Sequence, residues 1–188
     1  SNLEEIFFVP KLFLNSLITK KNFERISIDI NFENLEKIKN NRMMALNKKV
    51  LIIRDEVPAK INYRGKSYNA SIKLKGNLST HWETARQWSL KVNLKSGYTI
   101  LGMKEFSLTK HSERSYPSNP IISDFLSEIN ISTPSFQTFL VKFNGESWGI
   151  MLAEEQISSV YMEKRKLKDS LIIKPQTQDR TLSKQINF

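Results

Sequence analysis

The chain has 188 residues, 39% of them hydrophobic, which suits one folded unit with appendages better than two independent domains. Its 29 basic and 19 acidic residues give a net charge of +10, which favours anionic partners such as nucleotide phosphates, nucleic acid, anionic lipid or a cell-wall polymer. The lysines are spread through every segment, which argues against a dedicated nucleic-acid-binding protein. There is no cysteine, so disulfides, thiol catalysis and cysteine-ligated zinc are excluded.

No stretch approaches the roughly 20 apolar residues that a membrane-spanning helix requires, and the start lacks the layout of a secretory signal. Residues 3–18 are nevertheless rich in Ile, Leu and Phe. We therefore expect any membrane anchor of a longer protein to lie upstream of Ser1.

A short strand and an amphipathic helix are the first expected elements, and with an apolar lead-in they occupy residues 1–49. Ile26, Ile28 and Ile30 alternate with polar residues, as in a half-buried strand. Asn31 then suits the cap of a helix of about four turns. The apolar residues that recur at helical spacing are Phe32, Leu35, Ile38, Met43, Met44 and Leu46.

Residues 50–174 are expected to form the main domain, which begins with β-rich segments. Residues 50–54 and 57–63 are of this type, and a turn at Arg64-Gly65 joins the second to residues 67–75 in a predicted hairpin. Residues 87–94 alternate again, so one face packs and the other is free for chemistry. The packing face has Trp88, Leu90, Val92 and Leu94, and the free face has Gln87, Ser89, Lys91 and Asn93.

The second half of this domain combines strands and helices. Residues 105–109 favour a short strand, and Pro120 suits the first turn of an apolar helix, expected to lie against the sheet. Asn144-Gly145 between alternating apolar residues predicts a two-residue hairpin turn. Residues 154–167 look helical, whereas residues 175–188 form a polar tail or the start of a missing lobe.

Familiar catalytic motifs are absent: there is no phosphate loop of the GxxxxGK[ST] type, no GxGxxG, no HExxH and no GxSxG. His81 and His111 are the two histidines, and their separation makes a histidine-based metal site or triad improbable. Both are interpreted as solvated loop residues.

Four segments in a fixed order carry a resemblance. LKGNLSTHW at residues 74–82 precedes QWSLKV at 87–92; LGMKEFSL follows at 101–108, before Arg114; and FNGESWGIMLAEE runs from 143 to 155. Over about residues 57–174 this set resembles the CotH (spore-coat protein H) kinase family. The resemblance implies an α+β fold, an antiparallel sheet with flanking helices that forms a protein-kinase-like N-terminal lobe. The hairpin at 144–145 and the strand at 87–94 would share one sheet above an ATP pocket.

By this resemblance the polar face of the strand at 87–94 looks towards the nucleotide. Lys91 is the expected phosphate contact, because a lysine offsets charge that develops on the transferred group. Lys73 and Lys75 compete for that role, and a solvated strand lysine is the alternative interpretation. Gly76 and Ser79 would let backbone amides approach phosphate oxygens, although a plain turn explains them almost as well.

Arg114 matches an arginine that precedes a helix in the family, from which a guanidinium could pair with a carboxylate or phosphate. Ser115 stands where the family has Asn, so the local geometry there departs from the pattern. Glu154 and Glu155 match the acid at the hinge, which could accept from ribose or adenine. The alternative is that they favour the start of a following helix.

Phosphoryl transfer also needs carboxylates that position the hydroxyl and hold metal, in a second lobe. Only Asp169 and Asp179 follow Glu155, and neither lies in a recognisable motif, so the catalytic residues stay unknown and this chain alone is expected to be inactive. The intact protein would be a bacterial, extracytoplasmic or cell-envelope enzyme that phosphorylates protein hydroxyls with ATP and Mg or Mn. The alternative is a non-catalytic module that binds a partner protein or a cell-surface polymer.

Overall fold

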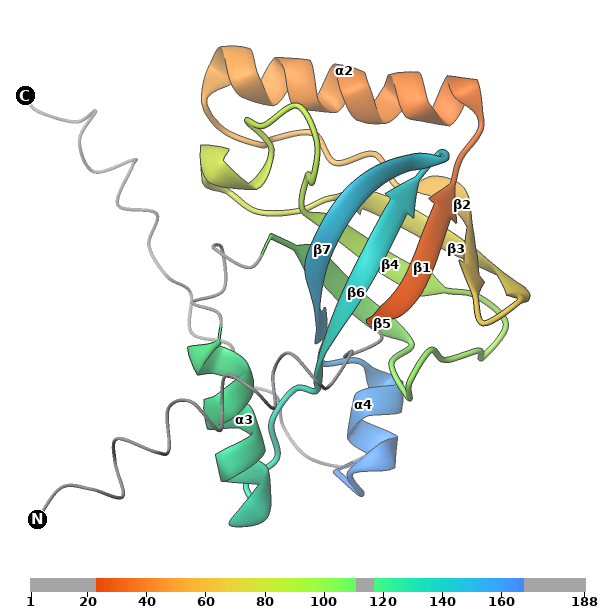
Figure 1. The fold of residues 1–188 in the computed structure, drawn as a ribbon. Helices are drawn as coiled ribbons and strands as arrows, with labels where there is room; N and C mark the ends of the chain where they lie inside the picture. The colour runs from red at the N-terminus through yellow and green to blue at the C-terminus, as the bar shows by residue number, and fades with distance from the viewer. Residues whose placement is uncertain (1–22, 111–116, 168–188) are drawn as a thin grey trace, which may run out of the picture.

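Alternating apolar and polar residues produce strands along most of the described chain. The computed structural model describes residues 23–110 and 117–167, and in these ranges seven strands form a closed barrel (Figure 1). The order around the barrel is β1-β2-β3-β4-β5-β7-β6. The strands are β1 (Glu24–Asp29), β2 (Val57–Tyr63), β3 (Lys66–Leu74), β4 (Leu90–Leu94), β5 (Glu105–Thr109), β6 (Phe136–Phe143) and β7 (Glu146–Glu155).

Closure of the barrel depends on β1 and β6. They pair in parallel, with Ile26 opposite Val141, whereas all other neighbouring strands pair antiparallel. The prediction of an α+β, protein-kinase-like lobe is therefore wrong: the described fold is mostly β, a closed mixed barrel with three short helices. The local periodicity of the sequence could not reveal this, because the pairing that closes the sheet joins residues far apart in the chain.

Two tight hairpins have the turns that the sequence predicts. Arg64 and Gly65 have φ values of 47° and 74° between β2 and β3, and Asn144 and Gly145 have 46° and 81° between β6 and β7. Positive φ at both central residues is the requirement of a type I′ turn. The Asn144 side chain also accepts a hydrogen bond from the Ile30 amide at 2.8 Å, which ties the second hairpin to the end of β1.

Apolar side chains fill the barrel interior. Leu90, Val92 and Leu94 of β4 are buried in it as predicted, and at one end the rings of Phe143 and Trp148 stack 4.4 Å apart. The predicted sharing of one sheet by β4 and the β6–β7 hairpin is confirmed. The inner side of that sheet is filled by core side chains, so an ATP pocket there is ruled out, and the polar residues of these strands lie on its outer face.

Helix α2 (Phe32–Lys48) packs across the barrel (Figure 1). The predicted cap is confirmed, because the Asn31 side chain accepts from the Asn34 amide at 2.9 Å. Ile38 and Ala45 belong to the same core as the strands. The helix ends at Lys49, whose φ is 54°. One apolar face therefore joins α2 to the sheet.

Two further helices lie beyond the strands, α3 (Ser118–Glu128) and α4 (Ser159–Lys164). The helix predicted around Pro120 is present, but the expectation that it packs on the sheet is wrong, since Phe125 is 60% exposed. Its buried residue is Ser123, which bonds to Thr133 and to the Pro134 carbonyl. Among the described residues, no helix is long and apolar enough to cross a membrane.

Two boundary predictions fail for a common reason. Residues 50–54 were expected to be β-rich yet belong to no strand, and the helix expected over residues 154–167 shrinks to α4 because β7 continues to Glu155. Pairing partners decide both: the closed barrel offers no free edge to the first segment, whereas β5 and β6 flank the end of β7.

Candidate functional site on the outer face of the barrel

The outer face of the barrel carries one row of polar residues. Pairing register places Lys73, Lys91, Ser107 and Glu154 side by side across β3, β4, β5 and β7. They point outward because alternate residues of the same strands fill the core. Lys91 Nζ lies 2.9 Å from Oε2 of Glu105. The row is therefore basic on β3 and β4 and acidic on β7.

Lys75 extends from the end of β3 into a half-buried cluster at this row. Its Nζ donates to Oγ of Ser107 at 2.7 Å and lies 3.8 Å from Oε2 of Glu154. Gln156 Nε2 also donates to Ser107 Oγ, at 3.1 Å. The side chains of Lys75 and Glu154 are 23% and 17% exposed, so solvent screens this pair less than a fully exposed one.

A buried hydroxyl lies further along β5 on the same face. Thr109 is two residues beyond Ser107, and its Oγ1 is buried without a hydrogen-bond partner in the part of the chain that the structure describes. Leaving such a group unpaired costs about 1–3 kcal/mol. Thr109 could therefore satisfy a polar group that entered the site.

The loop after Lys75 begins with a glycine that no other residue replaces easily. Gly76 has a φ of +97°, and a Cβ on it would lie 2.2 Å from the His81 ring. The His81 Nδ1 is 2.8 Å from Ser89 Oγ, and the Trp82 indole donates to the Gly76 carbonyl at 3.3 Å. The interpretation of His81 as a solvated loop residue is thus wrong, because its ring packs over Gly76. His111 lies outside the described residues.

Ser79 opens a short 3₁₀ turn, η1 (Ser79–His81), in the same loop. Its hydroxyl donates to Glu83 Oε2 at 3.0 Å, and its carbonyl accepts from the amides of Trp82 and Glu83. The amides of Leu78 and Ser79 donate to no acceptor among residues 23–110 and 117–167. Two backbone donors, two and three residues after Gly76, therefore have no acceptor in the described part of the chain.

Arg42 of α2 fixes the far side of this loop. Its Nε donates to the Trp82 carbonyl at 2.7 Å, and its Nη2 donates to the carbonyls of Glu83 and Thr84, both at 3.0 Å. Burial lowers the pKa of Arg42 from its ordinary value. The loop is thus held between α2 and the sheet, with its first residues next to Lys75.

The structure gathers most of the predicted site residues. Lys75, Lys91 and Glu154 share the outer face, Gly76 and Ser79 lie in the adjoining loop, and Arg114 lies outside the described residues. Sequence reasoning missed Ser107, although the inward Phe106 and Leu108 predict its direction. It also missed Gln156 and Arg42, which no local pattern marks.

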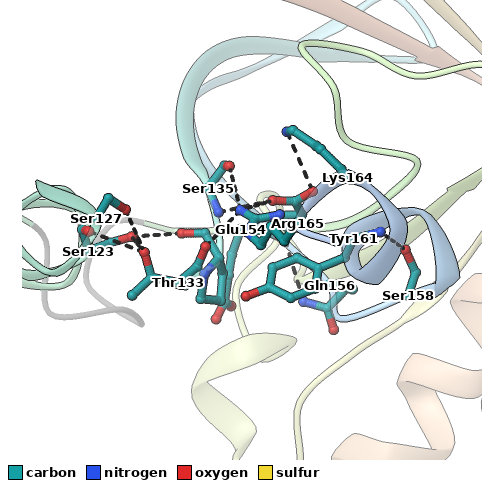
Figure 2. A network of polar contacts seen from close by, with 12 residues as sticks. Ser123, Ser127, Thr133, Ser135, Glu154, Gln156, Ser158, Tyr161, Lys164 and Arg165 are labelled. Atoms are coloured by element: carbon teal, nitrogen blue, oxygen red, sulfur yellow. Dashed lines mark hydrogen bonds and ion pairs between the residues drawn. The ribbon is translucent and has the colours of Figure 1, made fainter. Parts of the chain in front are cut away.

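A second polar network fastens α4 to the end of β7 (Figure 2). Glu155 points away from Glu154 and is 2% exposed, and its Oε2 accepts from Arg165 Nη2 at 3.0 Å and from the Ser135 amide at 3.2 Å. The Arg165 guanidinium lies 3.8 Å from the centroid of the Tyr161 ring. The two neighbouring glutamates therefore have separate roles, Glu154 in the outer-face cluster and Glu155 in this network.

The donors of the outer face suit a polyphosphate better than a metal ion. Lysine ammonium groups and backbone amides are phosphate ligands, whereas magnesium and manganese prefer carboxylate oxygens. In the described ranges no group of three or more His, Cys, Asp or Glu residues could hold a metal ion.

Comparison with known proteins follows the same segments. The sequence model of the family described as CotH kinase protein matches residues 61–187. The chain belongs to this family. The resemblance predicted from residues 57–174 is thereby confirmed, and the CotH match includes the outer-face row and its loop.

A CotH relative supports this assignment. Inner spore coat protein H of Bacillus subtilis (strain 168) is 29% identical to the chain over 119 residues. The aligned part is 63% of this chain and 32% of that protein. The chain thus spans about a third of the length of this relative.

Proposed function

We propose that the outer face of β3, β4, β5 and β7, with the loop after Lys75, binds the phosphates of ATP. In this proposal the chain is the nucleotide-binding part of a CotH-family kinase that transfers phosphate to protein hydroxyls. Membership of a family described as CotH kinase protein supports the proposal.

The observation that carries the proposal is the position of Lys75. Its ammonium is held by Ser107 and lies near Glu154, and the next residue is the glycine that opens the loop. A lysine beside free backbone amides is a suitable arrangement for phosphate oxygens. The amides of Leu78 and Ser79 would supply those donors, and Glu154 would keep Lys75 oriented.

Lys91 would supply a second positive charge in the same row. It is paired with Glu105, as Lys75 is with Glu154, so neither lysine depends on the nucleotide to stay in place. A site organised before binding loses less side-chain entropy when the ligand arrives. Arg114, expected from the family resemblance to contact phosphate or a carboxylate, belongs to this proposal as well.

ATP would bring Mg or Mn with it, which would shield charge on the transferred phosphoryl group. The described residues fit the phosphates but contain no metal-binding cluster, so no step is assigned through the metal. We place the catalytic carboxylates in the part of a longer protein that corresponds to the remaining length of the spore-coat relative. Because that relative is an inner spore coat protein, we also propose an extracytoplasmic or cell-envelope location.

Calorimetric titration of the chain with ATP and either metal tests the phosphate site. Replacing Lys75 or Lys91 by Ala removes one charged contact, worth about 1.5–3 kcal/mol, and should weaken binding by roughly ten-fold or more. Lys60→Ala is the matched control, because Lys60 is an exposed lysine of β2. Unchanged affinity in both site variants, or no heat from the parent chain at millimolar ATP, would remove the proposal.

A non-catalytic binding module is the second candidate. The exposed apolar side chains of α3 favour it, since contiguous exposed apolar residues often mark protein contacts. The two candidates separate in a longer protein. If the protein is a binding module, the parent and the Lys75→Ala variant should bind the partner protein or polymer with equal affinity. Incubation with radiolabelled ATP should then transfer no phosphate to any protein.

A further inference from the structure

Residues 50–55, between α2 and β2, form a β-prone segment that has no pairing partner. Val50, Ile52 and Ile53 are β-branched, and residues of this type favour extended strands. None of the backbone amides or carbonyls of residues 50–55 makes a backbone hydrogen bond in the described structure. Apart from the Leu51 carbonyl, which accepts from Arg54 Nη2 at 3.4 Å, the backbone groups of this segment can therefore pair with an added extended chain.

The segment borders an exposed apolar surface, which we call the α2 shoulder and define as Met43, Met44, Val50, Ile52 and Ile53. All five side chains are exposed, with Met43 at 50% and Ile52 at 63%. Leu51, between Val50 and Ile52, is buried in the core and fixes the segment to the barrel. The α2 shoulder is therefore an exposed surface that the buried Leu51 anchors to the barrel.

Asn41 adds a polar group beneath the shoulder. It is 2% exposed, and its Nδ2 has no acceptor among the described residues. It lines a hollow of about 10 Å³ together with Met44, Ile52 and Ile53. That volume is at the lower limit for one water-sized group, and a carbonyl or hydroxyl there would satisfy the amide.

Positive charge marks the α2 end of the shoulder, at Lys48 and Lys49, whereas at the other end the exposed Asp55 follows Arg54. Lys48 lines the same hollow and Lys49 follows it, both are exposed, and neither forms an ion pair with a described residue. Arg54, at the other end, donates to the Leu51 carbonyl and to the Asn77 side chain. A partner with carboxylates beside an apolar stretch would complement the lysines at the α2 end.

We propose that the α2 shoulder binds an extended apolar segment of a partner protein, flanked by acidic residues, which adds to residues 51–54 as a β-strand. Backbone hydrogen bonds between the partner and residues 51–54 would give affinity. The partner's apolar side chains would pack against Met43 and Ile52 and give selectivity, as in strand addition to other proteins. This proposal does not depend on nucleotide binding, because the shoulder and the outer-face row use different residues.

Amide hydrogen exchange tests the strand addition directly. The probe is a labelled peptide, Asp-Glu-Val-Thr-Val-Thr-Val-Glu-Asp, and its control carries Pro in place of the central Val. The first peptide should slow exchange at Ile52, Ile53 and Arg54, and the proline peptide should not, because it lacks an N–H for the ladder. Equal protection by both peptides, or protection at other sites only, would overturn the proposal.

Fluorescence polarisation of the same labelled peptide measures its affinity for the parent chain and for variants of the shoulder. We expect a Kd of roughly 10–100 µM, weakened about five-fold or more by Ile53→Pro and by Lys48→Glu. Ile122→Asp on exposed α3 is the control and should leave the Kd unchanged, and far-ultraviolet circular dichroism checks that each variant is folded. No binding by the folded parent chain up to about 1 mM would refute the proposal. The proposal would also be refuted if the amides of the shoulder were protected from exchange without peptide and more strongly at higher protein concentration. The occupant would then be a second copy of the chain.

Discussion

The guanidinium of Arg42 lies 5.1 Å from the centroid of the Trp88 ring. The same side chain donates to the carbonyls of Trp82, Glu83 and Thr84, so one residue of α2 contacts both the loop after Lys75 and the chain that leads into β4. The geometry of the candidate phosphate loop thus depends on a helix outside the barrel.

Removal of the Arg42 side chain should destabilise the protein. Arg42→Ala loses three hydrogen bonds and a cation–π contact, worth together about 2 kcal/mol, which lowers Tm by roughly 4–8 °C in a domain of this size. Differential scanning calorimetry measures the shift. Asn40→Ala, at an exposed position of the same helix, is the control and should leave Tm unchanged or slightly raised. An equal Tm for both variants would contradict the role of Arg42.

Gly76→Ala should distort the candidate site more than a comparable glycine change elsewhere. Gly76 and Gly97 both have positive φ, but a Cβ meets the His81 ring only at Gly76. We expect Gly97→Ala to cost about 1 kcal/mol in unfolding free energy and Gly76→Ala about 2–3 kcal/mol. Urea denaturation measures both. The double variant Gly76→Ala, His81→Ala should recover the difference, and failure to do so would show that the ring is not the obstacle.

Local elements of this fold follow from the sequence. The turns at Arg64-Gly65 and Asn144-Gly145 need positive φ, and alternation correctly separates buried from outward side chains over residues 90–94. It fails for Ser89, which was expected on the free face but is 0% exposed, because the strand begins only at Leu90. Closure of the barrel could not be predicted from the sequence. It depends on the parallel pairing of β1 with β6, and nothing in either strand's own alternation identifies the other as its partner. The prediction that α3 packs on the sheet was wrong, because apolar periodicity indicates that a helix has an apolar face but not which surface, if any, that face contacts.

The candidate site was partly predictable for the same reason. Lys91 and Glu154 lie in segments whose strand alternation determines an outward direction. The contacts of Lys75 with Ser107 and of Arg42 with Trp82 depend on how distant segments pair. Their functional roles stay predictions until binding is measured.

The buried pair of Glu155 and Arg165 should contribute strongly to the docking of α4. Arg165→Ala leaves the Glu155 carboxylate buried with Lys164 at 3.9 Å as the remaining cation, at a cost of about 3 kcal/mol. Chemical denaturation measures this loss. The double variant Glu155→Leu, Arg165→Met removes both charges and should regain most of the stability. A double variant no better than Arg165→Ala would mean that packing, and not the unpaired charge, sets the cost.

Glu56 gives a prediction about acid stability. The Ser71 hydroxyl, then Lys73 and Lys95, hold the pKa of Glu56 below its ordinary value of 4.5. A lowered pKa stabilises the fold above the unfolded-state pKa, and this contribution disappears as pH falls through the folded-state pKa. Because Glu56 and its lysine partners are partly exposed to solvent, Glu56→Gln should lower the free energy of unfolding by only about 0.5 kcal/mol at pH 7. Urea denaturation should show the gap closing towards pH 3, and a gap that widens there would contradict this sign.

The most direct measurement is nuclear magnetic resonance of the ¹⁵N-labelled chain during titration with ATP and magnesium. The amides of residues 75–79, Lys91, Ser107 and Glu154 should shift together, because they surround the proposed phosphates. The amides of Lys60 and Ile122 should stay in place. Shifts confined to other surfaces, or none at saturating ATP, would contradict a nucleotide site on the outer face of the barrel.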